Sequence, residues 1–309
     1  MSLSNTAVDI SEDALTNDVL KLLLFDRTTR RNIIWATNDY EDHGTEYKFA
    51  YPITIGCITG KNKEIIQPRI TKQKMHQQSR TKQKAEVFTP AWVCNEQNNL
   101  IDSVWFEREG VFNTSENEKW ETNHLKIVFE EKKGRRWTDY VDAKRLEITC
   151  GEAPYLTSRY DMATGTPIDV TDRIGLLDRK LRVVSENAST EDEWLRWTYR
   201  AFESIYGYEF QGDNLLLARE NLLYTFIDNM QQKLDRRPVP QELKKAALII
   251  SWNIWQMDGL TSAVPFKRTE RNTNDLNLEA AEELPGEPVY CKIRDWRSKE
   301  TLLYKSLFN

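Results

Sequence analysis

The sequence predicts an α/β fold, because stretches in which apolar residues recur at helical spacing alternate with short strand-like runs. Of the 309 residues, 39% are hydrophobic and 29% are charged, so the chain can bury a sizeable core and is not expected to be disordered throughout. A third observation is a strand-like run, 206–209, that ends in the acid Glu209 and is followed at once by a helical pattern. An acid in that position is typical of α/β folds that bind the ribose of a nucleotide or of S-adenosylmethionine.

The elements of the first half follow from apolar spacing and from the polar stretches between apolar runs. The predicted helices are 18–25 and 91–105. The predicted strands are 32–36, 51–55, 125–129 and 146–149, of which the first two could instead belong to an irregular N-terminal cap.

In the second half, two helices are predicted on the same grounds, over 191–205 and over 214–231. Residues 244–252 are expected to run from a helix into a strand, and 289–293 is expected to be a last strand. The predicted domain boundaries are 1–83 for a mixed N-terminal region and 84–309 for the main domain.

Charge is distributed unevenly along the chain. The formal net charge is −5, so the whole chain does not attract polyanions by bulk charge. The segment 61–84, in contrast, carries eight Lys or Arg and one acid, Glu64. Such a run either attracts phosphates or forms a solvated surface segment. We expect DNA phosphate contacts from Lys72, Lys74, Arg80, Lys82 and Lys84.

The cysteines and the apolar runs point to a reduced, cytoplasmic setting. The four cysteines are far apart in the sequence and no two of them form a Cys-x-x-Cys pair, so no zinc or redox motif is expected. There is no signal-peptide pattern and no apolar run long enough for a membrane span, so no membrane partner is expected.

Four segments occur in an order that carries more information than any one of them. They are 84–93, 146–156, 207–209 with the helix after it, and 249–260. This set resembles the adenine-N6 DNA methyltransferases of restriction–modification systems, in particular modification subunits and fused restriction–methylation enzymes. The resemblance covers 84–260, more than half of the chain.

In that family a Glu-x-Phe-Thr-Pro segment covers the methionine end of S-adenosylmethionine. Glu86, Phe88, Thr89 and Pro90 match it, and a helix is predicted to follow. From the sequence alone these residues also suit an ordinary helix start, with Thr89 as the N-cap and Pro90 at the first helical position.

The next element of the family is a strand followed by Asp-Pro-Ala-Cys-Gly-Ser-Gly and an aromatic residue, which together form a tight turn against the cofactor. Cys150, Gly151 and Tyr155 agree with it, while Glu147 replaces the Asp and Ala153 replaces the second glycine. Because glycine makes such a turn most easily, a stiffer and bulkier turn is expected here.

The last two segments supply acids for the cofactor. By resemblance, Glu209 would bind the ribose hydroxyls, and Asp258 would bind the amino group of the adenine. Asn253 also stands where the family often has Asn. Without the resemblance, Glu209 would precede an ordinary amphipathic helix, and Asp258-Gly259 would be an ordinary turn.

The catalytic turn of the family is missing. Adenine-N6 methyltransferases need an Asn/Asp-Pro-Pro-Tyr/Phe turn that holds the flipped base, and residues 259–309 contain none. The nearest runs, 263–266 and 287–290, lack the paired prolines. There is also no room after residue 260 for the remaining strands and a target-recognition domain. We therefore expect the front half of a methyltransferase or a decayed relative, with a complementing subunit supplying the turn.

The resemblance thus implies a Rossmann-like S-adenosylmethionine-dependent methyltransferase fold with a mixed N-terminal region. It implies S-adenosylmethionine as cofactor, DNA as partner, and a restriction, specificity or complementing methyltransferase subunit as a further partner. The alternative is a catalytically inert DNA-binding or regulatory subunit with the same fold. A third hypothesis is a metal-dependent restriction endonuclease, because Glu130–Lys132 and Glu131–Lys133 give Glu-x-Lys after a strand-like run. The plain alternative for that run is a charged strand end turning at Gly134, and no metal ligands are assigned.

Overall fold

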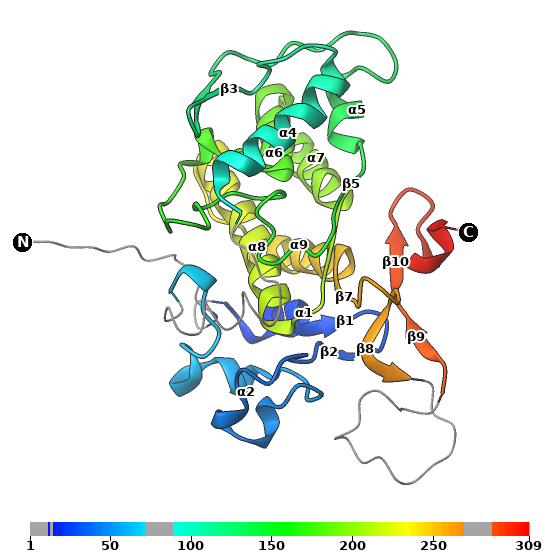
Figure 1. Ribbon diagram of the computed structural model, residues 1–309. Coiled ribbons are helices and arrows are strands. Elements are labelled where there is room, and N and C mark those ends of the chain that lie inside the picture. Colours follow the sequence, from blue (N-terminus) through cyan, green and yellow to red (C-terminus); the bar gives the residue numbers. More distant parts are fainter. Residues whose placement is uncertain (1–11, 13–14, 72–88, 269–285, 309) are drawn as a thin grey trace, which may run out of the picture.

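The computed structural model describes residues 12, 15–71, 89–268 and 286–308 and confirms a mixed α/β architecture (Figure 1). The described helices are α1 (Asn17–Leu24), α2 (Ile55–Ile58), α4 (Ala91–Phe106), α5 (Trp137–Asp142), α6 (Leu176–Asn187), α7 (Glu191–Glu203), α8 (Gly212–Leu234) and α9 (Pro240–Asn253). The strands are β1 (Phe25–Asp26), β2 (Arg31–Asn32), β3 (Asn113–Glu116), β4 (Lys119–Thr122), β5 (Arg145–Glu147), β6 (Ile205–Glu209), β7 (Ile254–Gln256), β8 (Ala263–Arg268), β9 (Pro288–Tyr290), β10 (Lys292–Asp295) and β11 (Glu300–Leu303).

Three strands form the central parallel sheet, in the order β5-β6-β7. Their register pairs Glu147 with Gly207 and Glu209 with Gln256. Parallel neighbours need a crossover connection, and here a pair of helices supplies each one. Helices α6 and α7 connect β5 to β6, and α8 and α9 connect β6 to β7. The remaining sheets are small antiparallel pairs.

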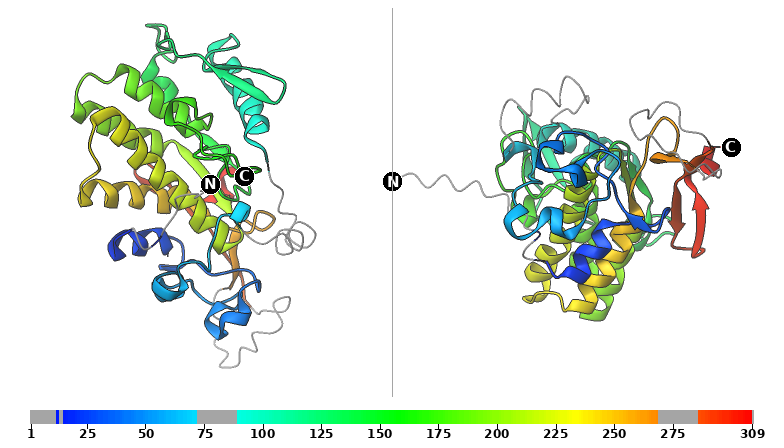
Figure 2. Two further views of the ribbon diagram at one scale, coloured as in Figure 1. Left: turned by 90° about the vertical axis from the view of Figure 1, so that its left-hand side faces the viewer. Right: turned by 90° about the horizontal axis from the view of Figure 1, so that it is seen from below.

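The two faces of the parallel sheet pack against different material, because successive strand residues point to opposite faces. Ile205 and Ile254 belong to the main hydrophobic core, together with buried residues of α1 and α6 to α9. Tyr206, Tyr208 and Trp255 belong to a second cluster, formed with the C-terminal strands. Figure 2 shows these C-terminal strands, in red, set to one side of the helices. The sheet is thus covered by helices on one face and by strands on the other.

The described part of the N-terminal region shares the main core, as residues such as Leu23, Trp35 and Ile53 show. One buried cation holds it there. The guanidinium of Arg219, on α8, donates to the carbonyls of Leu23 on α1 and Ile254 on β7. Burial lowers the pKa of Arg219 to about 9, but these carbonyls satisfy its donors.

The helix over 91–105 is confirmed as α4, but its buried face is not the apolar one. Asn95 and Asp102 are buried, whereas Leu100 and Val104 are 67% and 78% exposed. The polar face turns inward because the buried Arg179 of α6 needs partners. It makes an ion pair of 2.5 Å with Asp102 and donates to Asn95 Oδ1 at 2.8 Å.

The strand predicted over 125–129 is wrong, because these residues form no strand. Side chains of α6 form hydrogen bonds with the backbone of residues 125–129 instead. Glu186 accepts a hydrogen bond from the Ile127 N–H at 2.8 Å, and Arg182 donates to the Leu125 carbonyl at 2.9 Å. The Glu-x-Lys runs that follow are exposed and do not stand at a strand end.

Other elements also differ from the prediction. The run 289–293 contains two strands, β9 and β10, rather than one. Helices α5 and α6 and the β3–β4 hairpin lie in stretches where neither helix nor strand was predicted. No helix in the described part of the chain is long and apolar enough to cross a membrane.

Candidate cofactor-binding site

The carboxyl ends of β5, β6 and β7 meet at one edge of the parallel sheet. Beyond β5, the Cys150 N–H donates to the Tyr208 carbonyl at 2.8 Å. Beyond β7, the Met257 N–H donates to the Glu209 carbonyl at 3.0 Å. In open parallel sheets, ligands bind in the crevice outside the carboxyl ends of the strands. The residues predicted from three separate segments therefore lie at the end of the sheet where a ligand is expected.

Glu209 is the centre of this arrangement. It is 7% exposed, and its Oε2 accepts a hydrogen bond of 2.9 Å from the backbone N–H of Gly151. Its Oε1 accepts a hydrogen bond of 3.1 Å from the N–H of Gln211. Burial raises the pKa of Glu209, and these two N–H groups oppose that shift. Each carboxylate oxygen can accept more than one hydrogen bond, so Glu209 retains capacity to accept a further hydrogen bond from a ligand hydroxyl.

The turn after β5 contains three residues whose backbone is in the left-handed region. Thr149, Gly151 and Ala153 all have a positive φ, of 46°, 52° and 64°. Ala153 is fully buried, and its N–H closes the turn onto the Cys150 carbonyl at 2.7 Å. Ala153 therefore holds a left-handed conformation in spite of the strain that a Cβ introduces there.

Glu147 also belongs to the candidate site, although the sequence suggested only that it stands in place of the Asp of the family's motif. Its side chain is buried at the end of β5, and Oε1 accepts a hydrogen bond of 3.4 Å from the Tyr155 N–H. Within the described part of the chain, Oε2 accepts no hydrogen bond. Burial raises the pKa of Glu147 to about 8, and the charge of Glu209 adds to the shift. At neutral pH this carboxyl is therefore largely protonated and can donate a hydrogen bond.

The segment that leads into α4, at Thr89, lies against the turn that follows β5. Burial raises the pKa of Tyr155, while a hydrogen bond with the Thr89 side chain opposes the shift. The structure thus brings Thr89 next to the residues that follow Gly151. Pro90 occupies the N-cap position of α4 and Ala91 is the first helical residue, so the prediction of Thr89 as the N-cap is wrong by one position. The Ala91 N–H is instead capped by Asp161 Oδ2 at 2.8 Å. Glu86 and Phe88 lie outside the described residues.

Asp258 lies just beyond β7 and is half-buried. Its Oδ1 accepts hydrogen bonds from the N–H groups of Leu260, at 2.8 Å, and Thr261, at 3.4 Å. The carboxylate therefore stabilises its own turn, which is the ordinary structural role expected of an Asp-Gly pair. Asn253 is also structural: its amide donates to the carbonyls of Phe202 and Ile205 at 2.9 and 2.8 Å.

The N-terminal region borders this site in a way that the sequence did not reveal. The Gly212 N–H, at the start of α8, donates to the Trp35 carbonyl at 2.9 Å. A Cβ on Gly212 would lie 2.0 Å from the Ile34 carbonyl oxygen, so only glycine permits this approach. Tyr40 also donates from its hydroxyl to Asp213 Oδ2 at 2.6 Å. The region 31–53 therefore fixes the N-terminus of the helix that follows Glu209.

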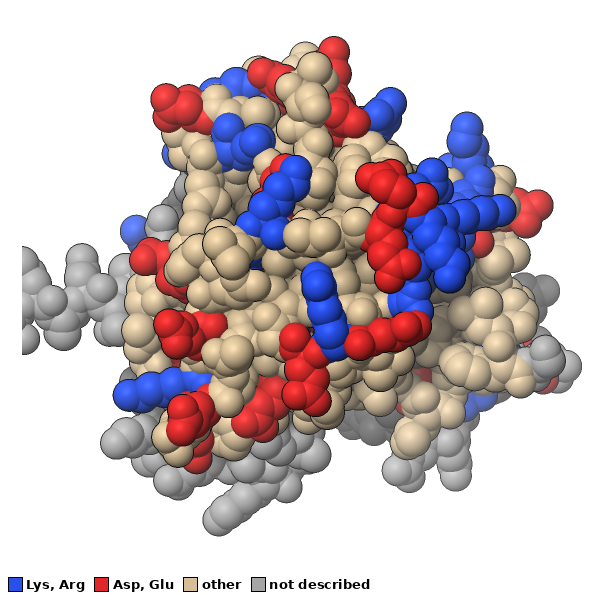
Figure 3. Space-filling view, turned by 90° about the horizontal axis from the view of Figure 1, so that it is seen from above, with Lys and Arg blue, Asp and Glu red and all other residues tan. Residues whose placement is uncertain are grey.

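The predicted phosphate contacts, Lys72, Lys74, Arg80, Lys82 and Lys84, lie outside the described residues. On the face in Figure 3, basic and acidic side chains are interspersed, with no broad region of one sign. Within the described chain, no group of three or more His, Cys, Asp or Glu side chains is arranged to hold a metal ion. The geometry therefore gives no support to the metal-dependent nuclease hypothesis.

Comparison of the chain with protein-family models, with curated proteins and with solved structures finds no match. The interpretation of the site therefore rests on its own geometry.

Proposed function

We propose that this protein binds S-adenosylmethionine at the carboxyl end of its parallel sheet, in a Rossmann-like half-domain related to adenine-N6 DNA methyltransferases. The observation that carries the proposal is the hydrogen bond of 2.9 Å between Gly151 N–H and Glu209 Oε2. It joins the tight turn after one strand to the acid at the end of the next strand. In nucleotide-binding α/β folds, these are the elements that approach the cofactor and bind its ribose.

The strand order supports the same proposal. When the three parallel strands are numbered by their order in the sequence, they lie side by side as 3-2-1, from β7 to β5. This is the first half of the doubly wound strand order 3-2-1-4-5-6. Thr89, beside Tyr155, is suitably placed to border the methionine moiety. Asp258 would need to leave its own turn, or to bind adenine through the second oxygen, in order to act as an adenine ligand.

A catalytically inert, DNA-binding or regulatory subunit is the second candidate, and one observation favours it. Both runs closest to the missing catalytic motif lie within or beside strands. Ala263 to Phe266 belongs to β8, and Pro288 to Tyr290 forms β9. Neither run forms the turn that would hold a flipped adenine. We therefore propose cofactor binding by this chain, with methyl transfer to DNA only when another subunit supplies the catalytic turn.

Isothermal titration calorimetry with S-adenosylmethionine tests cofactor binding. The wild type is expected to bind, and Glu209→Gln is expected to bind at least about tenfold more weakly, since a hydrogen bond to a charged acceptor contributes roughly 1.5–3 kcal/mol. Glu121→Gln, on the exposed β4, is the control and should bind like the wild type. No binding by the wild type, or equal binding by Glu209→Gln, would contradict the proposal.

A methyl-transfer assay on adenine-containing DNA then separates the two candidates. The isolated protein is expected to be inactive, and a partner that carries an Asn-Pro-Pro-Tyr turn is expected to restore transfer. Transfer by the isolated chain would show that the catalytic group lies within it.

A further inference from the structure

A cavity of about 460 Å³ lies between the segment 159–173 and the last third of α8. Its lining includes Arg159, Tyr160, Ile168, Arg173, Asp228 and Gln232. At 1.5 Å per residue along the helix, Asp228 is about 24 Å from Gly212, where α8 begins beside Glu209. The cavity is therefore separate from the candidate cofactor site.

Two buried arginines share one carboxylate oxygen in the wall of this cavity. Asp228 Oδ2 accepts a hydrogen bond of 3.1 Å from Arg159 Nε and one of 2.7 Å from Arg173 Nη2. The arginine side chains are 10% and 6% exposed, and that of Asp228 is 25% exposed. Arg173 Nε also donates to the Ile168 carbonyl at 3.2 Å. A single exposed carboxylate thus receives both guanidinium groups.

The donors of these two arginines outnumber their acceptors, since a guanidinium carries five N–H groups. Within the described chain, the Nη1 atoms of Arg159 and Arg173 are buried without a hydrogen-bond partner, and Nε is the one side-chain nitrogen of Arg159 that makes a hydrogen bond. Arg159 also lies over the Tyr224 ring, 4.9 Å from its centroid, a cation–π contact that supplies no oxygen acceptor. Because an unsatisfied buried donor costs free energy, a ligand that supplies acceptors is favoured here.

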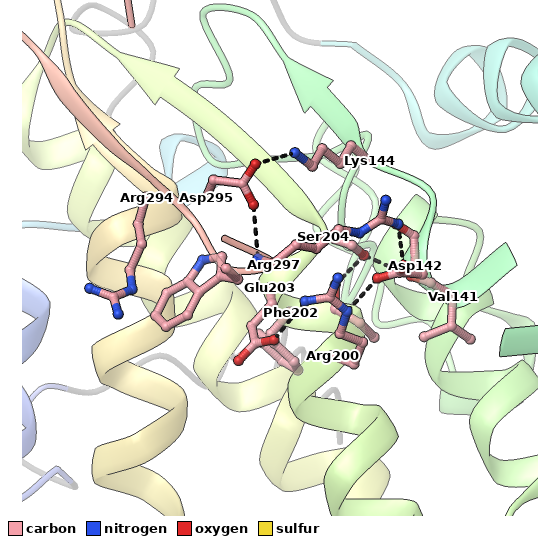
Figure 4. A network of polar contacts seen from close by, with 12 residues as sticks. Val141, Asp142, Lys144, Arg200, Phe202, Glu203, Ser204, Arg294, Asp295 and Arg297 are labelled. Carbon is pink, nitrogen blue, oxygen red and sulfur yellow. Dashed lines mark hydrogen bonds and ion pairs between the residues drawn. The ribbon is translucent and has the colours of Figure 1, made fainter. Parts of the chain in front are cut away.

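The cluster around Asp142 shows how the same protein satisfies a pair of arginines without a ligand (Figure 4). Arg200 and Arg297 also meet on one aspartate, but each binds a different oxygen of Asp142. Arg200 has a second carboxylate, that of Glu203, at 3.1 Å. Within the described chain, neither arginine has a buried nitrogen without a partner. The pair at Asp228 differs from this cluster in its missing acceptors.

Two further acids lie close to the pair, so the cavity has no large excess of positive charge. Asp169 is exposed and lines the cavity. Burial raises the pKa of Asp178, and the charge of Arg173 opposes this shift, which places Asp178 near Arg173. A ligand is therefore favoured by the missing acceptors more than by net charge.

A phosphate monoester supplies what the arginines lack. It offers three acceptor oxygens and a charge of about −1.5 to −2 at neutral pH, and a guanidinium matches the geometry of phosphate. The cavity is larger than a phosphate group alone and is within the range of small-molecule sites, roughly 300–1,000 Å³. One side of it is an apolar wall, formed by Pro167, Ile168 and Val170. The wall suits the organic part of an ester.

We propose that this cavity binds a small organic phosphate monoester, with its phosphate on Arg159 and Arg173 and its organic part against the apolar wall. Asp228 acts as an internal competitor, because its carboxylate holds the guanidinium groups when no phosphate is present. Binding then requires at least one guanidinium to turn from Asp228 toward the ligand. The site goes beyond the proposed function and does not depend on it.

Isothermal titration calorimetry of the full-length protein with phenyl phosphate tests the proposal. The wild type is expected to bind saturably at millimolar concentration or below. Arg159→Gln and Arg173→Gln should each bind at least about tenfold more weakly, because each removes charge-assisted hydrogen bonds. Arg297→Gln is the control, at an arginine of the Asp142 cluster, and should bind like the wild type. No binding by the wild type, or equal binding by all three variants, would overturn the proposal.

Asp228→Asn separates recognition from a purely structural role. Asparagine keeps the shape of the side chain but removes a negative charge that competes with phosphate, so this variant should bind phenyl phosphate at least about threefold more tightly. The loss of a merely structural ion pair would not increase affinity. Unchanged or weaker binding by Asp228→Asn, with a native circular dichroism spectrum, would overturn the proposal.

Other ligands identify the occupant. Inorganic phosphate is expected to bind at least about tenfold more weakly than phenyl phosphate, because it buries nothing against the apolar wall. Equal affinity would assign the site to free phosphate and overturn the proposal of an ester. A DNA oligonucleotide that displaces phenyl phosphate would identify a phosphodiester as the occupant, with the same consequence.

Two last measurements complete the test. In crystals grown with phenyl phosphate, the phosphate is expected within hydrogen-bond distance of both guanidinium groups, and water alone at the two Nη1 atoms would contradict the proposal. Calorimetry with S-adenosylmethionine should give the same affinity for Arg173→Gln as for the wild type. Phosphate binding and cofactor binding can therefore fail independently.

Discussion

At the scale of single residues, Glu147 and Glu209 are two buried carboxyls at the ends of neighbouring strands with different environments. Two backbone N–H groups bind Glu209, whereas Glu147 has one long hydrogen bond and an oxygen without a partner in the described chain. The environment therefore favours the charged form of Glu209 more than that of Glu147. Environments that differ in this way are common at functional sites.

This difference predicts the dependence of stability on pH. The pKa of Glu147 is about 8 in the folded protein, compared with 4.5 for an ordinary Glu. Between these values the folded protein holds a proton that the unfolded chain releases, so the free energy of unfolding falls as pH rises. Glu147→Gln cannot ionise and should lose less stability between about pH 5 and about pH 8, by on the order of a few kcal/mol.

Urea unfolding at the two pH values measures this, with Glu130→Gln, at an exposed site, as the control. The same pH dependence in wild type and Glu147→Gln would show that Glu147 is not held protonated.

Ala153 makes a second residue-scale prediction. It has φ 64° in the turn that approaches Glu209, a conformation that costs a residue with a Cβ roughly 1 kcal/mol more than glycine. Ala153→Gly should therefore raise the free energy of unfolding by about 0.5–1 kcal/mol, after allowing for the greater freedom of glycine in the unfolded chain. Chemical denaturation measures this change. A clear loss of stability would mean that the buried methyl group contributes more by packing than it costs in strain.

At the scale of elements, the start of α8 depends on a close approach of backbones. A Cβ at Gly212 would meet the Ile34 carbonyl oxygen at 2.0 Å and its carbon at 2.9 Å. Gly212→Ala should therefore displace the segment around Ile34 and destabilise the fold by about 1–3 kcal/mol. It should also weaken cofactor binding, because α8 follows Glu209 directly.

Gly56→Ala is a suitable control, since a Cβ at Gly56 meets only Thr54 Oγ1, at 4.0 Å. Neither Gly56 nor Gly212 has a left-handed backbone, so the two variants differ in the clash alone. Thermal unfolding compares the two variants, and an equal loss would mean that the contact with Ile34 is not what requires glycine at 212.

The sequence predicted several of the helices and strands, and the structure shows why other features were missed. Helices such as α7 and α8 and the strands beside them follow from their apolar patterns. The inverted face of α4 could not be predicted, because it depends on Arg179, a buried cation from a later helix. The irregular 125–129 depends likewise on hydrogen bonds from Arg182 and Glu186.

For the site, the resemblance assigned Cys150 and Gly151 to a turn and Glu209 to the ribose, and the structure joins Gly151 to Glu209 by a hydrogen bond. The sequence did not predict the protonation of Glu147, which depends on burial. Nor did it predict the contact of Gly212 with Ile34, which depends on how the N-terminal region packs.

At the scale of the whole molecule, Arg219 joins α1 to the junction of α9 and β7, which is far away in the sequence. It contacts α1, β7 and the end of α9 through the carbonyls of Leu23, Ile254 and Ser251. Arg219→Leu would leave these buried carbonyls without their donor, and should destabilise the fold by about 3 kcal/mol or more. Arg196→Leu, at a side chain that is 70% exposed, should change stability by less than about 1 kcal/mol. Comparable urea midpoints for the two variants would show that the N-terminal region does not depend on this cation.

The central proposal is that S-adenosylmethionine binds at the carboxyl end of the parallel sheet, beside the turn at Gly151 and the acid Glu209. The most direct measurement is the NMR amide signal of Gly151 during titration with S-adenosylmethionine, because this N–H donates to Glu209. The signals of Gly151 and Gln211 are expected to shift together and to saturate, and Glu209→Gln should need at least about tenfold more cofactor to reach half of the full shift. Saturable shifts confined to residues away from the carboxyl ends of β5 and β6, or no shift at all, would contradict the account.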